Sequence, residues 1–260
     1  MTDNLLPALL AQIASGRVRI IDLTQTLSPE FPTLELPPVF GQCAPLRVET
    51  VSEYDERGPA WYWRNFSCNE HTGTHFDAPI HWVTGRSLDR NSTDTIPVEH
   101  LVGATCVIDC VAESAANPDF LMTREHIERW EGRHGRIPRD AWVLMRTDWS
   151  KHAATDLYRN MNDTGQHTPG PAPDAIRWLV EERGIRGFGT ETIGTDAGQA
   201  HTMTPQYPAH HYLHGAGRYG LQCLTNLDLL PPTGAVLLCP PLKLEKGSGS
   251  PLRVLALVAQ

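Results

Sequence analysis

Apolar residues in the amino-terminal part of the chain follow helical spacing first and strand spacing later. The run at 5–13 repeats leucine, alanine and isoleucine at helical intervals and stops before Gly16, and residues 19–23 predict a strand after it. Residues 31–46 are rich in proline and predict a loop. Alternation of apolar and polar residues at 61–68 predicts a second strand.

Strands and helices then alternate through the middle of the chain. The pattern predicts strands at 104–111 and 141–146, with a helix between them that Thr123 caps. Pro173 opens a further helix with an apolar stripe that runs to residue 183, and a strand at 185–189 follows it directly. This alternation predicts a mixed α/β fold.

The carboxyl-terminal part adds two apolar strands, at 236–239 and 253–258. They are joined by Lys246-Gly-Ser-Gly-Ser-Pro251, which lacks the Gly-x4-Gly-Lys-Ser/Thr order of a phosphate-binding loop and is expected to be a flexible connection. A histidine-rich segment at 201–214 is expected to run from a loop into a turn or helix.

Composition limits the classes of protein to consider. With 260 residues and 40% apolar content, the chain can bury a core in one domain that spans residues 1–260. A net charge of −8 predicts neither nucleic acid nor an anionic membrane surface as a partner. The first residues lack the basic start and apolar run of a signal peptide, and six cysteines without a Cys-x-x-Cys are expected to stay reduced, which predicts a cytoplasmic protein.

The segment His71-Thr-Gly-Thr-His75-Phe-Asp77-Ala-Pro-Ile-His81 places three histidines and one aspartate within eleven residues. Imidazole nitrogens and a carboxylate oxygen suit a catalytic divalent ion such as zinc or manganese, with positions left free for water and substrate. The segment contains no thiolate ligand, which argues against a closed structural site. We therefore expect a catalytic metal site.

The spacing of these ligands requires a folded backbone. A fully extended segment would separate the Cα atoms of His71 and His75 by about 13 Å, too far for two ligands of one ion. Gly73 is the residue that can adopt a positive φ at little steric cost and fold His71 back toward His75. His75 and Asp77, two residues apart, can then share one face of a short extended stretch.

The end of the segment predicts a proton-transfer group. Pro79 fixes the exit of the loop and presents His81 from the far side of the site. In this arrangement His81 need not be a ligand, because a histidine beside an activated water molecule can take or return its proton near neutral pH.

The same segment resembles the signature of the cyclase family of metal-dependent hydrolases, which includes bacterial kynurenine formamidases and isatin hydrolases. The similarity continues through Ile21-Asp22-Leu23-Thr24, residues 189–196 and 210–228, and the tail from Pro241-Leu242-Lys243 to Arg253-Val254. The resemblance implies a swivelling β/β/α-type fold, a small aromatic substrate whose amide is hydrolysed, and a homodimer or homotetramer.

Carried over residue by residue, the resemblance implies that His71, His75 and Asp77 are metal ligands and that His81 is the catalytic histidine. A later family histidine near the substrate falls on the pair His210-His211. Of the two, His210 is assigned to catalysis and His211 to substrate binding.

Aromatic side chains are expected to stack on a flat substrate ring, and the candidates are Phe40, Trp63 and Trp82. Glu191 and Asp196 have two alternative roles. Their carboxylates could orient the imidazoles of the site, or they could be solvent-exposed or helix-capping groups.

One departure from the family pattern concerns the number of metal ions. The chain reads Thr225-Asn226-Leu227 where two-metal formamidases have Glu-Asn-Leu, and threonine is a poor replacement for a bridging carboxylate. The resemblance therefore leans toward single-metal isatin hydrolases of the manganese type. It implies one divalent ion, Mn²⁺ in preference to Zn²⁺, and opening of isatin to isatinate.

Other functions stay open at this point. The same motif would serve an N-formylkynurenine formamidase, or a hydrolase of another cyclic amide, imide or lactone. A metal-independent serine or cysteine hydrolase needs an activated nucleophile, and the chain contains no Gly-x-Ser-x-Gly. A non-catalytic metal-binding protein would hold an ion without turning over any of these substrates.

Overall fold

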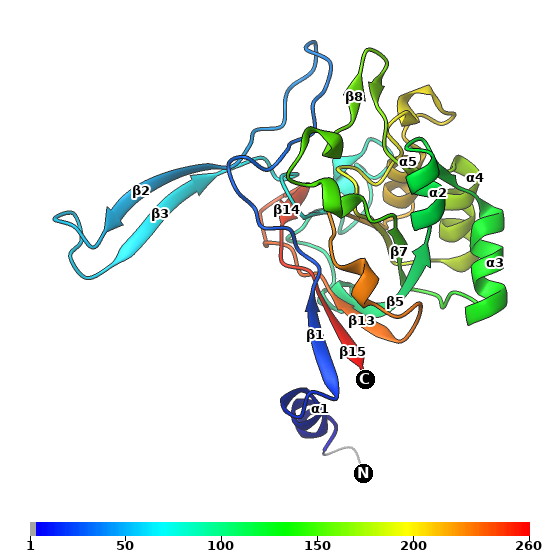
Figure 1. Cartoon of the computed structure of the whole chain (residues 1–260), viewed down its shortest axis with the longest axis horizontal. Helices are drawn as coiled ribbons and strands as arrows, with labels where there is room; N and C mark the ends of the chain where they lie inside the picture. The colour runs from blue at the N-terminus through cyan, green and yellow to red at the C-terminus, as the bar shows by residue number, and fades with distance from the viewer. Residues whose placement is uncertain (1–3) are drawn as a thin grey trace.

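A mixed sheet of nine strands forms the centre of the computed structural model, which describes residues 4–260 (Figure 1). In sheet order the strands are β1 (Val18–Asp22), β15 (Leu255–Ala259), β13 (Ala235–Leu238), β5 (Val102–Asp109), β7 (Trp142–Arg146), β11 (Gly187–Thr190), β12 (Tyr219–Gln222), β4 (His75–Asp77) and β14 (Gly249–Pro251). The run β5, β7, β11 and β12 is parallel, and the strands on both sides of it pair antiparallel. The predicted α/β class with a mixed sheet is confirmed.

Three of the helices pack on one face of this sheet. The α-helices are α1 (Leu5–Ala14), α2 (Val111–Ala116), α3 (Arg124–His134), α4 (Pro173–Trp178) and α5 (Pro208–Gly215), and α4 continues into a π-helical turn at Leu179–Arg183. Residues of α3, α4 and α5 share one buried cluster with Val143 and Met145 of β7. The alternate residues Trp142 and Leu144 join a second cluster on the other face, as the two-residue period of a strand requires.

The second core shows that the sheet curls. It collects Ile21 of β1, Phe76 of β4 and Ala256 of β15, which come from opposite ends of the strand order. Smaller two-stranded sheets lie outside it: β2 (Arg47–Glu53) with β3 (Tyr62–Ser67), β6 (Leu121–Met122) with β10 (Gly170–Pro171), and β8 (Met161–Asn162) with β9 (Gly165–Gln166).

The predicted helices and strands are present, with ends displaced by one or two residues. Helix α3 begins directly after Thr123, whose backbone N–H donates to His126 Nδ1 at 3.2 Å. The strand predicted at 61–68 is β3, and the helix from Pro173 ends where Gly184 adopts a φ of +61°. The loop at 31–46 contains neither helix nor strand.

The connection at 246–251 corrects a prediction. It is not simply a flexible linker, because Gly249–Pro251 forms β14 and pairs with β4 in the main sheet. Ser250 is fully buried there. The short strand β4 has β12 on one side, and β14 supplies the hydrogen-bonding partner on its other side.

A hairpin of β2 and β3 projects away from the main body (Figure 1). Its apolar side chains face solvent, with Trp63 57% and Phe66 70% exposed. None of the helices within residues 4–260 combines the length and the apolar character needed to span a bilayer.

Candidate metal centre

The backbone around β4 folds as the ligand spacing requires. Gly73 has a φ of +68°, the left-handed region that glycine enters at little cost. The turn brings the ring centroids of His71 and His75 to 5.3 Å. A 3₁₀ turn at Pro79–His81 then returns the chain, so that the rings of His81 and His71 lie 3.9 Å apart. The predicted glycine hinge is confirmed.

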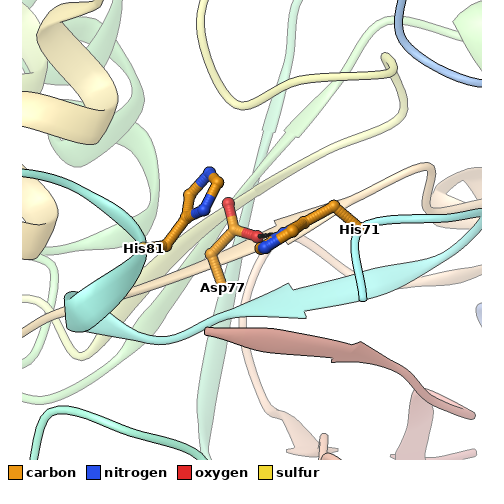
Figure 2. Close-up of side chains that lie close together, drawn as sticks. All are labelled: His71, Asp77 and His81. Atoms are coloured by element: carbon orange, nitrogen blue, oxygen red, sulfur yellow. Dashed lines mark hydrogen bonds and ion pairs between the residues drawn. The ribbon is translucent and has the colours of Figure 1, made fainter. Parts of the chain in front are cut away.

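Asp77 lies at the middle of the cluster and is 1% exposed. Its Oδ1 is 2.7 Å from His71 Nδ1 and 3.5 Å from His75 Nε2. Figure 2 shows the rings of His71 and His81 on two sides of this carboxylate. The same carboxylate oxygen thus lies close to nitrogens of both His71 and His75, which would be far apart in an extended chain.

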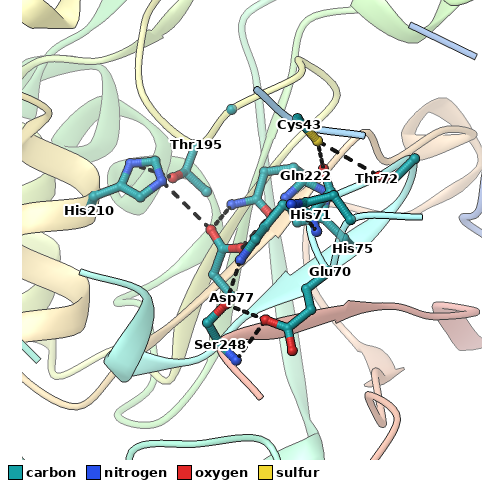
Figure 3. Close-up of polar contacts among 12 residues, drawn as sticks. Cys43, Glu70, His71, Thr72, His75, Asp77, Thr195, His210, Gln222 and Ser248 are labelled. Carbon is teal, nitrogen blue, oxygen red and sulfur yellow. Dashed lines mark hydrogen bonds and ion pairs between the residues drawn. The ribbon is translucent and has the colours of Figure 1, made fainter. Parts of the chain in front are cut away.

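The other carboxylate oxygen faces a second group. Asp77 Oδ2 is 3.7 Å from His210 Nε2 and 4.0 Å from His214 Nε2, and Gln222 Nε2 donates a hydrogen bond to it (Figure 3). His210 and His214 are one turn apart on α5, so both rings project from the same side of that helix. Gln222 comes from the end of β12, beside β4.

Hydrogen bonds on the outer ring nitrogens fix which nitrogens point inward. His75 Nδ1 lies 2.7 Å from the Gly73 carbonyl and His214 Nδ1 lies 3.1 Å from the Arg218 carbonyl. A carbonyl can only accept, so each Nδ1 carries the proton and each Nε2 presents a lone pair toward Asp77. Within residues 4–260, the fully buried Nε2 of His214 has no hydrogen-bond partner. Lone pairs that face a buried carboxylate fit a bound cation.

Asp196 organises the α5 side of the site. Its carboxylate accepts the backbone N–H groups of Ala209 at 2.6 Å and His210 at 3.2 Å, and so caps the start of α5. The same carboxylate lies 2.5 Å from His210 Nδ1. This bond directs His210 Nε2 toward Asp77.

The donor atoms gather closely enough to hold a divalent ion. The ligand atoms of His71, Asp77 and His81 lie within 4.8 Å of one another, as do those of Asp77, His210 and His214. His75 adds its Nε2 on the Oδ1 side of the carboxylate. Imidazole and carboxylate donors of this kind suit manganese or zinc. The division between ligands and the proton-transfer group stays a prediction, because His81 also lies within ligand reach.

The site shifts the pKa of its histidines in both directions and lowers the pKa of Asp77. Burial lowers the pKa of His75 to about 4 and lowers the pKa of His81 well below its usual value. Burial opposes the charge of Asp77, but the neighbouring histidines, His81 and His71 foremost, hold its pKa well below the usual value. Burial also opposes protonation of His210, but the hydrogen bond and charge of Asp196 raise its pKa.

Of the four residues predicted to contact substrate, Trp82 lies at the site. Its ring centroid is 4.9 Å from His210 and 5.5 Å from Tyr207. The site also includes residues that the sequence analysis did not single out, chiefly His214 and Gln222. The spacing of four residues between His210 and His214 was the available signal, since it is the helical period.

The placement of Phe40, Trp63 and His211 within one chain does not support the substrate contacts predicted for them. Phe40 is 60% exposed in the 31–46 loop, and Trp63 is on the projecting hairpin, where its ring packs against Trp61. The ring of His211 packs against Tyr212 instead. Helical geometry accounts for His211, because adjacent residues on a helix point about 100° apart.

The residue on β12 beside Asp77 was not among those singled out from the sequence. The residue compared with the bridging carboxylate was Thr225, but the side chain that contacts Asp77 is Gln222. The backbone N–H of Thr225 donates to the Leu23 carbonyl at 3.0 Å, next to β1. The inference about charge is unchanged, because an amide, like a hydroxyl, is no substitute for a bridging carboxylate.

Comparison with known proteins finds relatives that match nearly the whole chain. The chain matches the family model described as putative cyclase over residues 21–197. It is 49% identical over 258 residues to the isatin hydrolase of Roseibium aggregatum, and the match covers 98% of each chain. The structure of isatin hydrolase A from Labrenzia aggregata bound to benzyl benzoate is similar with a TM-score of 0.97 and 61% identity, covering 98% of this chain and 99% of that one. An isatin hydrolase bound to the product analogue thioisatinate gives a TM-score of 0.98 and 46% identity over 100% of both chains.

Proposed function

Since the chain belongs to the putative cyclase family, we propose that it is a metal-dependent hydrolase that opens the cyclic amide of a small aromatic substrate, with isatin as the preferred example. The observation that carries the proposal is the buried Asp77 carboxylate, which is surrounded by imidazole nitrogens, with the lone pairs of His75 and His214 facing it. Near full-length similarity to isatin hydrolases supports the choice of substrate class.

The proposed ligands of the ion are His71, His75 and Asp77. When bound, a divalent cation supplies acidification of a water molecule and polarisation of the substrate carbonyl. The resemblance favours one Mn²⁺ over Zn²⁺. The identity of Gln222 supports a single ion. A second ion beside Asp77 would need another charged donor, and Gln222 offers a neutral amide there.

The proposed role of His81 is proton transfer. Burial keeps its imidazole neutral at neutral pH, so it can accept a proton from water. Addition of the water oxygen to the carbonyl carbon is followed by cleavage of the C–N bond. The proton held by His81 then passes to the leaving nitrogen. The new carboxylic acid releases its proton to solvent, so that the product carries a carboxylate and an aromatic amine.

His210 and Trp82 complete the proposed site. Asp196 fixes His210 with its Nε2 toward Asp77, where it can assist the proton transfer or hydrogen-bond the substrate. The ring of Trp82 beside His210 offers an aromatic face for a flat substrate.

A cysteine nucleophile is disfavoured. Burial raises the pKa of Cys223 to about 12 and of Cys106 to about 11. It also raises the pKa of Cys43 and Cys68, the two partly exposed thiols. Each cysteine thiol with a shifted pKa is thus held in its unreactive protonated form.

The proposed assembly is a homo-oligomer, a dimer or tetramer. The exposed aromatic side chains of the β2–β3 hairpin support a contact between copies, because a projecting apolar ribbon is unusual on an isolated chain. Light scattering of the purified protein measures the assembly, and a monomer would contradict it.

The proposed activity is tested by incubating the purified protein separately with isatin and with N-formylkynurenine, with and without a chelator. We expect isatin opening that is abolished by the chelator and restored by Mn²⁺. Preference for N-formylkynurenine would identify the linear formamide as substrate instead. Activity that resists complete metal removal would refute the metal-dependent mechanism.

A further inference from the structure

Glu70 and Ser248 lie behind His71, at the ring nitrogen that does not face Asp77 (Figure 3). His71 Nε2 is 2.9 Å from Ser248 Oγ. Ser248 in turn donates both its hydroxyl, at 2.5 Å, and its backbone N–H, at 3.0 Å, to Glu70 Oε2. The three side chains form a chain of hydrogen bonds from the protein surface to the candidate metal centre.

The direction of these bonds follows from counting protons. The carboxylate of Glu70 can only accept, so the single hydroxyl proton of Ser248 points to it. Ser248 Oγ then has only lone pairs to offer His71, and His71 Nε2 must carry the ring proton. In the neutral imidazole the other nitrogen, Nδ1, then keeps a lone pair, and it lies 2.7 Å from Asp77 Oδ1.

We propose that Glu70 and Ser248 are positioning residues that fix the tautomer and orientation of His71, so that it binds the metal through Nδ1. The inference rests on the proposed function, because it requires a metal at this site. His75 and His210 show the same construction, with their outer nitrogens tied to the Gly73 carbonyl and to Asp196. Partners of this kind hold ligating histidines in position and raise their basicity.

The residue after Ser248 also indicates that this segment supports His71 as well as joining two strands. The next residue, Gly249, packs so closely against His71 that a Cβ there would lie 2.6 Å from His71 Cε1. Ser248 therefore bonds one edge of the imidazole while the backbone of Gly249 supports the ring beside it. The glycine-serine segment is shaped to His71 as well as joining two strands.

A purely structural role is the alternative, since the Ser248–Glu70 bonds also tie the 246–251 segment to the loop before His71. Ser250 provides a matched control in the same segment. It is fully buried, accepts the Leu242 N–H at 2.8 Å and donates to the Pro251 carbonyl at 2.8 Å. Replacing Ser250 perturbs the segment without touching the ring of His71.

The test measures Mn²⁺ affinity by titrating metal-free protein and following free Mn²⁺ by electron paramagnetic resonance. We expect Ser248→Ala to weaken Mn²⁺ binding by about 10- to 100-fold, the usual cost of losing such a partner. Glu70→Ala should weaken it in the same direction, and Glu70→Gln should weaken it less, because an amide oxygen can still accept from Ser248. Ser250→Ala should keep wild-type affinity, whatever its effect on thermal stability.

The outcomes separate the two proposals. A wild-type protein that binds no Mn²⁺ refutes the proposed function and the positioning role together. A wild-type protein that binds Mn²⁺ while Ser248→Ala and Glu70→Ala keep its affinity refutes only the positioning role. Equal losses in Ser248→Ala and Ser250→Ala would also refute it. If Ser248→Ala does not fold, the Mn²⁺ affinities of Glu70→Ala and Glu70→Gln test the positioning role, because Glu70 is partly exposed.

Discussion

Gly249→Ala is a steric test of the candidate metal centre. A Cβ at this position would lie 2.6 Å from His71 Cε1, 3.0 Å from His71 Nδ1 and 2.4 Å from the Phe76 carbonyl oxygen. Ordinary van der Waals contact begins at 3.4 Å, so the imidazole would have to withdraw by about 0.8 Å even if the backbone did not move. The ring that moves is a proposed ligand, and the nitrogen nearest the new methyl group is the one that faces Asp77.

A displacement of about 1 Å at a catalytic group can reduce turnover by about 10²-fold. We therefore expect Gly249→Ala to lose about 10²-fold in kcat for isatin opening, together with weaker Mn²⁺ binding. Overpacking against the Phe76 carbonyl should also lower the free energy of unfolding by about 1–3 kcal/mol. The assay is spectrophotometric hydrolysis of isatin at saturating Mn²⁺, with circular dichroism to confirm folding.

Gly132→Ala is the matched control. Gly132 lies in α3 and would place its Cβ in open space, so this variant should keep full activity and gain up to about 1 kcal/mol of stability. A folded Gly249→Ala protein with wild-type turnover and Mn²⁺ affinity would show that His71 does not need its observed position.

Three further variants test separate parts of the account. His81→Ala should keep its metal and lose about 10²- to 10⁴-fold in kcat, whereas loss of metal in elemental analysis would make His81 a ligand. Asp196→Asn should reduce kcat by about 10- to 100-fold and leave Mn²⁺ affinity unchanged. The reason is that the asparagine amide can donate to His210 Nδ1, which moves the ring proton to Nε2. Unchanged turnover would show that Asp196 has no part in positioning His210. Burial opposes the charge of Glu131, but hydrogen bonds from Arg183 outweigh it and lower its pKa below 4.5. The Glu131–Arg183 pair therefore stabilises the fold at pH values above the ordinary glutamate pKa, and this contribution is lost as the pH falls below that value. Denaturation experiments from neutral to acidic pH should show a smaller loss of stability for Glu131→Gln than for wild type.

Local chemistry explains why much of the fold could be predicted from the sequence. Gly73 had to take a positive φ because two ligands four residues apart cannot share an ion on a straight strand, and its φ of +68° agrees. Thr123 and Gly184 marked helix ends through capping preferences that act over a few residues. Such signals need no knowledge of the tertiary fold.

Features that depend on distant segments could not be predicted in this way. The strand at Gly249–Pro251 exists because β4 needs a partner, and a short glycine-serine sequence carries no strand pattern of its own. His214 and Gln222 reach Asp77 through the packing of α5 and β12, each far from residue 77 in sequence. Nearness along the chain does not fix nearness in space: Trp82 lies beside His210, whereas Trp63 is on the projecting β2–β3 hairpin.

The requirement for Asp77 is the most direct test of the central claim that one carboxylate and two imidazoles hold a catalytic ion. Asp77→Asn keeps the shape of the side chain and removes its charge, in a cluster where histidine nitrogens approach both carboxylate oxygens. Mn²⁺ stoichiometry by elemental analysis, measured with isatin hydrolysis on the same sample, should show bound metal and turnover in wild type and neither in the folded variant. A folded Asp77→Asn protein that retains stoichiometric metal and opens isatin would contradict the account.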